Sequence, residues 1–296
     1  MGCARGRKAR VRKYTWPVIL TFAPAAGLFS PAALVLALPS VVALACYVGA
    51  AMPSDRFSAS LCQALLAGWI AQGLSIVIDI AGVGSGISGA RFGFAPALSI
   101  TLWLVLAVYE LESRFVPLTG VRRALASCGI VVVVLAWIFP GQVHPQAASA
   151  WAPVHWLLGI ASYALFGVAV MHALLLNRAE GQMRAGGGMK VPVAGGPPLL
   201  RLERLTFRFV GAGFAMLTAA IVLGVWFADP WRWDHKAVFS ILGWLVFAGL
   251  LAGRRAFGWR GPKATRGVYA GAVLLLLAYV GSRFVLEVVL HRPPVA

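Results

Sequence analysis

The sequence predicts an all-α, polytopic membrane protein, and its composition and hydropathy pattern are the observations that indicate it. Hydrophobic residues make up 60% of the 296 residues and charged residues only 12%, a balance that excludes an ordinary soluble domain. Long apolar runs recur along the chain, each sufficient to cross a hydrocarbon layer of roughly 30 Å. Because these runs are continuous rather than alternating, they favour membrane helices over the strands of a β-barrel.

About eight transmembrane helices are expected, since a helix needs about 20 apolar residues to cross the bilayer. The runs that qualify cover residues 32–52, 61–80, 94–113, 122–139, 154–176, 208–228, 235–252 and 267–290. Together they form one transmembrane domain over residues 31–291. A flexible cytoplasmic linker is expected at about 177–207, and residues 292–296 form a short tail.

Residues 1–30 form a basic extension whose place in this scheme is open. The basic stretch from Arg5 to Lys13, followed by PVILTFAPAAGLF, resembles the start of a secretory signal. With eight spans this basic start would lie outside, against the positive-inside rule. Either Thr15 to Ser30 inserts as a short extra segment, or the true start lies further downstream.

The orientation of the bundle follows from the positive charges of its loops. Loops 114–123, 177–208 and 253–266 are rich in arginine and are therefore expected in the cytoplasm, whereas loop 140–153 has no Lys or Arg. The turn at 229–236 is also poor in positive charge and is expected to face outward. We attribute the net charge of +17 to this topology and to contact with anionic membrane lipids, not to nucleic-acid binding.

Two sequence patterns exclude other functions. The cysteines form neither a C-x-x-C pair nor a C-x-x-C-H motif, so thiol exchange and covalent haem attachment are not encoded; they are Cys3, Cys46, Cys62 and Cys128. Gly84, Gly86 and Gly89 match G-x-G-x-x-G. They follow a membrane span instead of a β-strand, so a dinucleotide site is not predicted.

The outward turn carries an unusual cluster of aromatic side chains beside a histidine. Trp226, Trp231 and Trp233 lie close to Asp234 and His235. Interfacial enrichment of tryptophan in any membrane protein is one explanation. Histidine, however, is the commonest side-chain metal ligand and a usual axial ligand of haem iron. The turn is therefore a candidate wall for a flat, apolar, iron-bearing ligand.

Topology places three histidines from separate spans near the outer face. His155 begins the fifth span, His235 begins the seventh and His291 ends the eighth. His144 lies in an outer loop, and His172 lies about 25 Å from His155 at 1.5 Å per residue. A histidine at a helix end is commonly a solvated cap, but three at one depth make an axial pair possible. We predict His155 and His235 as metal ligands.

The last span contains two ionisable residues, Arg283 and Glu287, near its outer half. Charges inside a membrane are functional candidates, and a guanidinium suits a carboxylate such as a haem propionate. The alternative is an ion pair between the two side chains, four residues apart, that neutralises both. We predict Arg283 as a propionate contact and leave this alternative open.

Several stretches of the chain resemble the cytochrome c assembly family, the haem-handling membrane proteins that include CcsA and CcmC. The stretches are HWLLGIASYALFGVAVMHALLL, PPLLRLERLTFRFVGAGFAMLTAAIVLGVWF, HKAVFSILGWLVF, GWRG and LAYVGSRFVLE. The chain is most similar to the shorter branch that resembles YpjD and HemX. The resemblance covers most of residues 31–291 and is most specific after residue 150.

The resemblance implies a haem site at the outer face, with a tryptophan-rich wall and histidine ligands from neighbouring helices. The W-x-W-D-x-K part of the family motif is matched by Trp231, Trp233, Asp234 and Lys236, while the upstream W-G is absent. His235 replaces the proline of that motif and matches the H-K of the shorter branch.

The resemblance also carries over two outer histidines. His155 matches the one that precedes an S-Y pair, and His291 lies near the second, one residue out of register. The membrane-embedded histidine of the family's inner haem site is not matched, because Gly253 and Arg254 stand there. One outer site is therefore expected.

The sequence thus predicts an inner-membrane protein, not an enzyme, that holds a non-covalent b-type haem at its outer face. It would assist cytochrome c biogenesis or haem trafficking, with haem, membrane lipid and other cytochrome c maturation proteins as partners. The alternatives are a HemX-like regulator of haem-synthesis enzyme levels, a solute transporter, and a cytochrome b that transfers electrons.

Overall fold

A computed structural model describes residues 31–53, 58–81, 90–114, 121–139, 142–144, 151–184, 199–227 and 233–285. The basic extension at 1–30 and the tail at 292–296 lie outside the described residues, as does the end of the last predicted span, 286–290. All statements below about what is present or absent concern the described part of the chain.

The described chain is helical almost throughout, which confirms the all-α prediction. The helices are α1 (Pro31–Ala51), α2 (Ser58–Ala81), α3 (Phe94–Ser113), α4 (Val121–Ile138), α5 (Ala152–Arg184), α6 (Leu199–Phe227), α7 (His235–Phe257) and α8 (Pro262–Leu276), followed by a π-helical segment, η1 (Leu277–Gly281), and α9 (Ser282–Phe284). Among the described residues, seven helices are long and apolar enough to cross a membrane, and α1 adds a shorter apolar stretch at Ala37–Ala51. The first seven predicted spans therefore each correspond to one helix, and the described part of the eighth is covered by α8, η1 and α9 in succession.

The ends of α7 show how local sequence sets the helix boundaries. Asp234 precedes the helix, and its Oδ1 accepts a hydrogen bond of 2.7 Å from the backbone N–H of Ala237. Gly258 ends the helix in the left-handed conformation, with φ of 62°, and its N–H caps the last turn. Pro262 then begins α8, where its missing N–H removes no helical hydrogen bond.

Two helices extend beyond the spans that hydropathy predicts. Helix α5 continues to Arg184 instead of ending near residue 176, and α6 begins at Leu199 instead of residue 208. Much of the range predicted as a flexible linker is therefore helical. Hydropathy detects only the part of a helix that suits lipid, whereas the adjoining Arg, Glu, Gln and Leu residues are good helix formers.

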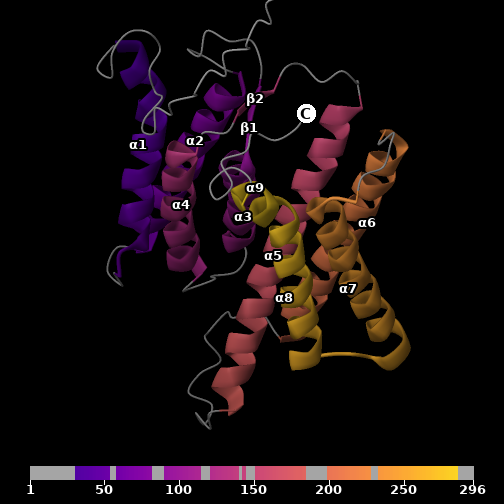
Figure 1. The fold of residues 1–296 in the computed structure, drawn as a ribbon. Helices are drawn as coiled ribbons and strands as arrows, with labels where there is room; N and C mark the ends of the chain where they lie inside the picture. Colours follow the sequence, from indigo (N-terminus) through magenta and orange to yellow (C-terminus); the bar gives the residue numbers. More distant parts are fainter. Residues whose placement is uncertain are drawn as a thin grey trace, which may run out of the picture.

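The helices form two groups that meet at α5 (Figure 1). In the first group α1 packs against α2 and α4, and α3 packs against α4; in the second, α6 packs against α5, and α8 against α5 and α7. Helix α3 also packs against α5 and links the two groups. A short antiparallel pair of strands, β1 (Ala90–Phe92) and β2 (Gln142–His144), joins two loops at one end, so His144 is paired through its backbone with Ala90.

Each group has its own buried core, and glycines bring its helices close together. Tyr47 is fully buried in the first core, and a Cβ atom at Gly68 or Gly129 would lie 2.9 Å or 2.8 Å from its ring. In the second core Phe166 and Phe247 stack with ring centroids 3.9 Å apart. In lipid, such close contacts between helices supply packing energy that hydrophobicity cannot.

Replacing Gly129 with alanine is expected to destabilise the first core. The new methyl group would overlap the Tyr47 ring, and overpacking of this kind costs about 1–3 kcal/mol. The thermal unfolding of the purified protein in detergent measures the effect. The matched control is Gly49→Ala in α1, where nothing lies within 4 Å of the new atom. Equal melting temperatures for the two variants would contradict the packing described here.

Candidate ligand cavity

A cavity of about 490 Å³ lies in the second group of helices, with α3 closing one side. Its back wall is one face of α5, from His155 to Val170, so at 1.5 Å per residue it extends about 22 Å along that helix. Aliphatic and aromatic side chains make up most of the lining, including Ile160, Phe166, Leu217, Ile221, Val273 and Leu276. A cavity of this size and character is typical of a site for an apolar ligand.

His155 brings an imidazole to the end of the cavity where α5 and α7 begin, which we call the tryptophan end. Its ring is half-buried, and its Nδ1 lies 2.9 Å from the backbone carbonyl of Ala220 in α6. Because a carbonyl only accepts hydrogen bonds, this contact places a proton on Nδ1. In the neutral ring the lone pair then resides on Nε2, which is the usual arrangement of a histidine that binds a metal.

A glycine one turn further along α6 also contacts the His155 ring. A Cβ atom at Gly224 in α6 would lie only 3.0 Å from Cε1 of His155. The ring therefore rests directly on the α6 backbone and has little freedom to move. The hydrogen bond to Ala220 and the contact with Gly224 together orient the imidazole before any ligand binds.

Lys236, at the second position of α7, also lines the cavity, whereas His235 does not. Its Nζ lies 5.9 Å from the centroid of the Tyr279 ring, within the range of a cation–π interaction. Ser240, one turn further along α7, lines the cavity on the same face. Lys236 and His235 are both exposed, but consecutive helical residues point about 100° apart, so only Lys236 of the two borders the cavity.

The π-helical segment η1 contributes Tyr279 and Val280 to the lining, next to α5. Tyr163 of α5 donates a hydrogen bond of 2.7 Å to the carbonyl of Leu275, just before η1 begins. Tyr279 lies within η1, and its ring meets that of Tyr163 edge to face at 6.4 Å. A π-helical turn changes the hydrogen-bond register of a helix and is frequent at functional sites. Here it directly follows the last turn of α8, which the hydrogen bond from Tyr163 ties to α5.

The remaining predicted site residues lie away from the cavity or outside the described residues. Trp226 and Trp233 are 84% and 72% exposed at the tryptophan end, and neither lines the cavity. Trp231 and His291 lie outside the described residues. Arg283 belongs to α9, but the structure does not describe its side chain, and Glu287 lies outside.

His172 is buried in a structural contact instead of the cavity. Its Nε2 lies 3.0 Å from a carboxylate oxygen of Glu112 in α3, its Nδ1 donates to the carbonyl of Val168, and its ring stacks on Phe209. His172 therefore joins α3 to α5 within the bundle.

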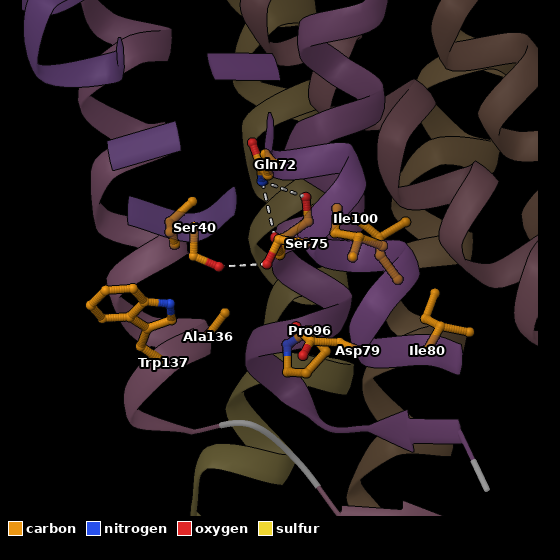
Figure 2. A pocket seen from close by; sticks show the side chains of 12 residues that line it. Ser40, Gln72, Ser75, Asp79, Ile80, Pro96, Ile100, Ala136 and Trp137 are labelled. Carbon is orange, nitrogen blue, oxygen red and sulfur yellow. Dashed lines mark hydrogen bonds between the residues drawn. The ribbon is translucent and has the colours of Figure 1, made fainter. Parts of the chain in front are cut away.

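A second, much smaller cavity of about 20 Å³ lies in the first group of helices (Figure 2). Ser40 and Ser75 form a hydrogen bond across it, and Gln72 at its edge donates to both oxygens of Ser99. The volume admits about one water molecule. This cavity is too small for an organic ligand, and the larger one is the candidate functional site.

The described residues contain no group of three His, Cys, Asp or Glu side chains that could hold a metal ion by themselves. The fold and the large cavity define a polytopic membrane protein with an apolar cavity between its helices. The sequence comparison then gives the family: residues 57–290 match the family described as "Cytochrome C assembly protein", and the chain belongs to it.

Curated relatives support this membership. The inner membrane protein YpjD of Escherichia coli K12 is 32% identical over 211 residues, which covers 69% of this chain and 78% of YpjD. The cytochrome c biogenesis protein CcsA of Parasynechococcus marenigrum is 27% identical over 217 residues, covering 62% of this chain and 71% of the relative. No solved structure matches the chain significantly.

Sequence reasoning missed the part that Lys236, Tyr163 and Tyr279 play in lining the cavity. The sequence assigns Lys236 only to the W-x-W-D-x-K motif. Lys236 and Ser240 are four residues apart and therefore lie on the same face of an otherwise apolar helix. This spacing could have indicated that α7 turns a polar face toward a site. Nothing in the local sequence signals the π-helical turn that carries Tyr279.

Replacing Tyr163 with phenylalanine is expected to loosen the η1 wall. The change removes the hydrogen bond to Leu275, which contributes about 1 kcal/mol, and leaves the ring in place. Hydrogen–deuterium exchange should therefore increase in the peptide that covers residues 275–281. Tyr269→Phe, which loses its contact with Asn177 instead, serves as the control. Unchanged protection of that peptide in Tyr163→Phe would contradict a role for this bond.

Proposed function

We propose that this membrane protein binds a non-covalent b-type haem in the large cavity and presents it at its outer face. The role would be in cytochrome c biogenesis or haem trafficking. The observation that carries the proposal is His155, whose oriented imidazole lies in the wall of an apolar cavity with Nε2 as the metal-binding nitrogen. YpjD is named an inner membrane protein, so we place this chain in the inner membrane with the tryptophan end outward.

The cavity residues suit a porphyrin in three respects. The aliphatic side chains and Phe166 offer a dry wall for an apolar ring, and Trp156, Tyr163 and Tyr279 add aromatic surfaces. His155 offers the iron ligand. A bound haem would supply the redox-active iron, while the residues of this chain bind it, orient it and exclude water.

The positive charge of Lys236 suits the acidic edge of a haem. Its ammonium group lies in the cavity wall at the same end as His155, where a propionate would reach the outer surface. We propose Lys236 as one carboxylate contact and retain Arg283 of α9 as a second. This arrangement would direct the apolar edge of the ring toward the middle of the membrane.

The other predicted residues keep a place in this proposal at the mouth of the site. His235 and His291 are candidates for a second, exchangeable axial ligand, because both are expected at the outer face. Trp231, Trp233 and Trp226 would form the aromatic surface over which haem is passed to or from a partner, a further cytochrome c maturation protein. Exposure of Trp226 and Trp233 is consistent with contact to such a partner or to lipid.

Replacing His155 with glycine is expected to weaken haem binding by more than about tenfold, since even the loss of a group that only orients a metal ligand weakens metal binding about 10- to 100-fold. The measurement is a haemin titration of the purified protein in mild detergent, followed by a pyridine haemochrome assay. Imidazole added to His155→Gly should restore the Soret band. His235→Ala in parallel tests the second ligand. Full haem content in the variant that combines His155→Gly with His235→Ala would refute ligation by these histidines.

Gly224→Ala tests whether the orientation of His155 matters. The added methyl group would displace the imidazole by a few tenths of an ångström, so we expect binding about tenfold weaker with a shifted Soret maximum. Gly211→Ala in the same helix is the matched control, because nothing lies within 4 Å of its new atom. Identical spectra for the two variants would contradict the proposed position of the ligand.

The rival functions give different results in the same system. Solute flux in liposomes without haem absorbance would favour a transporter. Stable haem with quinol-driven reduction would favour an electron-transferring cytochrome b. Altered levels of haem-synthesis enzymes in a deletion strain, without transfer of haem to a partner, would favour a regulator.

A further inference from the structure

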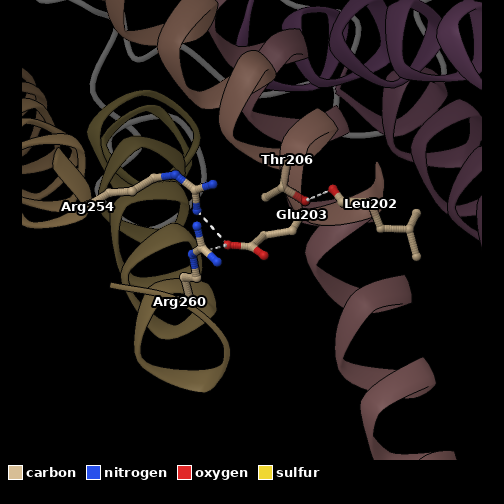
Figure 3. Close-up of polar contacts among 5 residues, drawn as sticks. All are labelled: Leu202, Glu203, Thr206, Arg254 and Arg260. Carbon is tan, nitrogen blue, oxygen red and sulfur yellow. Dashed lines mark hydrogen bonds and ion pairs between the residues drawn. The ribbon is translucent and has the colours of Figure 1, made fainter. Parts of the chain in front are cut away.

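The opposite end of the bundle, where α7 ends and α8 begins, carries an arginine cluster that the haem proposal does not use. Arg254 of α7 lies 2.7 Å from Oε1 of Glu203 in α6, and Nε of Arg260 lies 3.8 Å from the same oxygen (Figure 3). Two guanidinium groups therefore share one carboxylate, and the cluster keeps a net charge of +1.

The two arginines are held differently. Arg254 is mostly buried, and its guanidinium lies over the Phe207 ring at 3.6 Å from the centroid, so its position is fixed. Arg260 is 70% exposed and touches Glu203 only at long range through Nε. Among the described residues, no hydrogen bond or ion pair occupies the two terminal nitrogens of Arg260.

The loop that carries Arg260 is built to a fixed shape. Gly258 and Gly261 flank Trp259 and Arg260, and both have φ of 62°, a conformation that other residues rarely adopt. The Trp259 ring lies against Gly253, where a Cβ atom would come within 2.4 Å of it. Because backbone and indole are both constrained, the Arg260 side chain projects from a rigid base.

Two aromatic side chains place this loop in the lipid headgroup layer. Phe257 is 76% exposed and Trp259 is 41% exposed, and their rings stack with centroids 6.1 Å apart. Exposed aromatic residues at the end of a membrane helix lie at the boundary between hydrocarbon and headgroups. A ligand of Arg260 would therefore come from the membrane and not from solution.

Charge complementarity points to a phosphodiester. Such a group carries one negative charge, which would balance the net +1 of Arg254, Glu203 and Arg260. Its two unesterified oxygens match the planar fork of a guanidinium. Exposed positive side chains on the adjoining turns of α7 and α8, namely Arg255, Lys263 and Arg266, increase the local attraction. They outnumber the one further carboxylate at the loop, that of Glu180, whose Oε1 lies 3.9 Å from where a Cβ atom of Gly261 would stand.

We propose that the loop Gly258–Gly261 is a binding site for the phosphodiester of an anionic membrane phospholipid, with Arg260 as its bidentate contact. Arg254 and Glu203 position the site, and Phe257 and Trp259 hold it at headgroup depth. The site lies at the far end of the bundle from His155 and does not depend on haem binding.

Native mass spectrometry of the full-length protein, released from nanodiscs of phosphatidylcholine with increasing phosphatidylglycerol, tests the proposal. Arg260→Gln should lower the apparent affinity for phosphatidylglycerol about fivefold, which corresponds to about 1 kcal/mol. Arg260→Lys keeps the charge but loses the fork, and it should bind more weakly than wild type. The matched control is Arg123→Gln, which removes an exposed arginine from α4 at the same end of the bundle.

Three results would overturn the site. Equal losses in Arg260→Gln and Arg123→Gln would reduce the effect to general surface charge. Wild-type affinity in Arg260→Lys would exclude recognition by a guanidinium fork. Displacement of phosphatidylglycerol by millimolar inorganic phosphate would identify a site for soluble anions. Because Arg260 is exposed, all variants are expected to fold, and unchanged melting temperatures would establish this.

Discussion

The packing of α5 against α6 is the contact on which the rest of the structure depends. Phe166 of α5 lies against Gly213, and His155 lies against Gly224, with each ring about 3 Å from where a Cβ atom would stand. In lipid, helices gain little from hydrophobicity and associate through such close contacts between small and large residues. Because α5 also contributes to the first core, this one interface sets the position of both helix groups and of the cavity between them.

The polar groups of the first helix group explain why that half provides a rigid support. Trp69 and Trp103 stack at 5.0 Å, and each indole donates a hydrogen bond to the backbone carbonyl of the other residue. Tyr47 donates to Gln72, which in turn donates to Ser99. A polar group without a partner is costly inside a membrane, so each contact fixes the rotation of one helix against the next. Helix α3 is thereby fixed where it closes the cavity.

The fold could be predicted from the sequence more completely than the site. Runs of apolar residues located all eight helices, because the bilayer leaves a hydrophobic segment of this length few other structures. Helix ends were less certain: the charged ends of α5 and α6 lie outside the signal that hydropathy detects. The face that each helix turns inward depends on packing. Topology and the family resemblance therefore predict His155 as a ligand at the outer face, but no pattern places Lys236 in the cavity wall. The hydrogen bond that precedes the π-helical turn joins Tyr163 to Leu275, 112 residues away, and no local pattern encodes it.

The distribution of polar groups in the cavity favours an amphiphile that is carried and released. A path for a hydrophilic solute would need polar groups through the middle of the membrane, where the described lining is mainly aliphatic and aromatic. Electron transfer across the membrane would favour a haem fixed between two imidazoles, yet among the described residues His155 is the one histidine in the cavity wall. In the proposed site His155 would be the fixed ligand, and a second ligand would be exchangeable. Such a site would favour transient binding over permanent retention, as a haem-handling role requires.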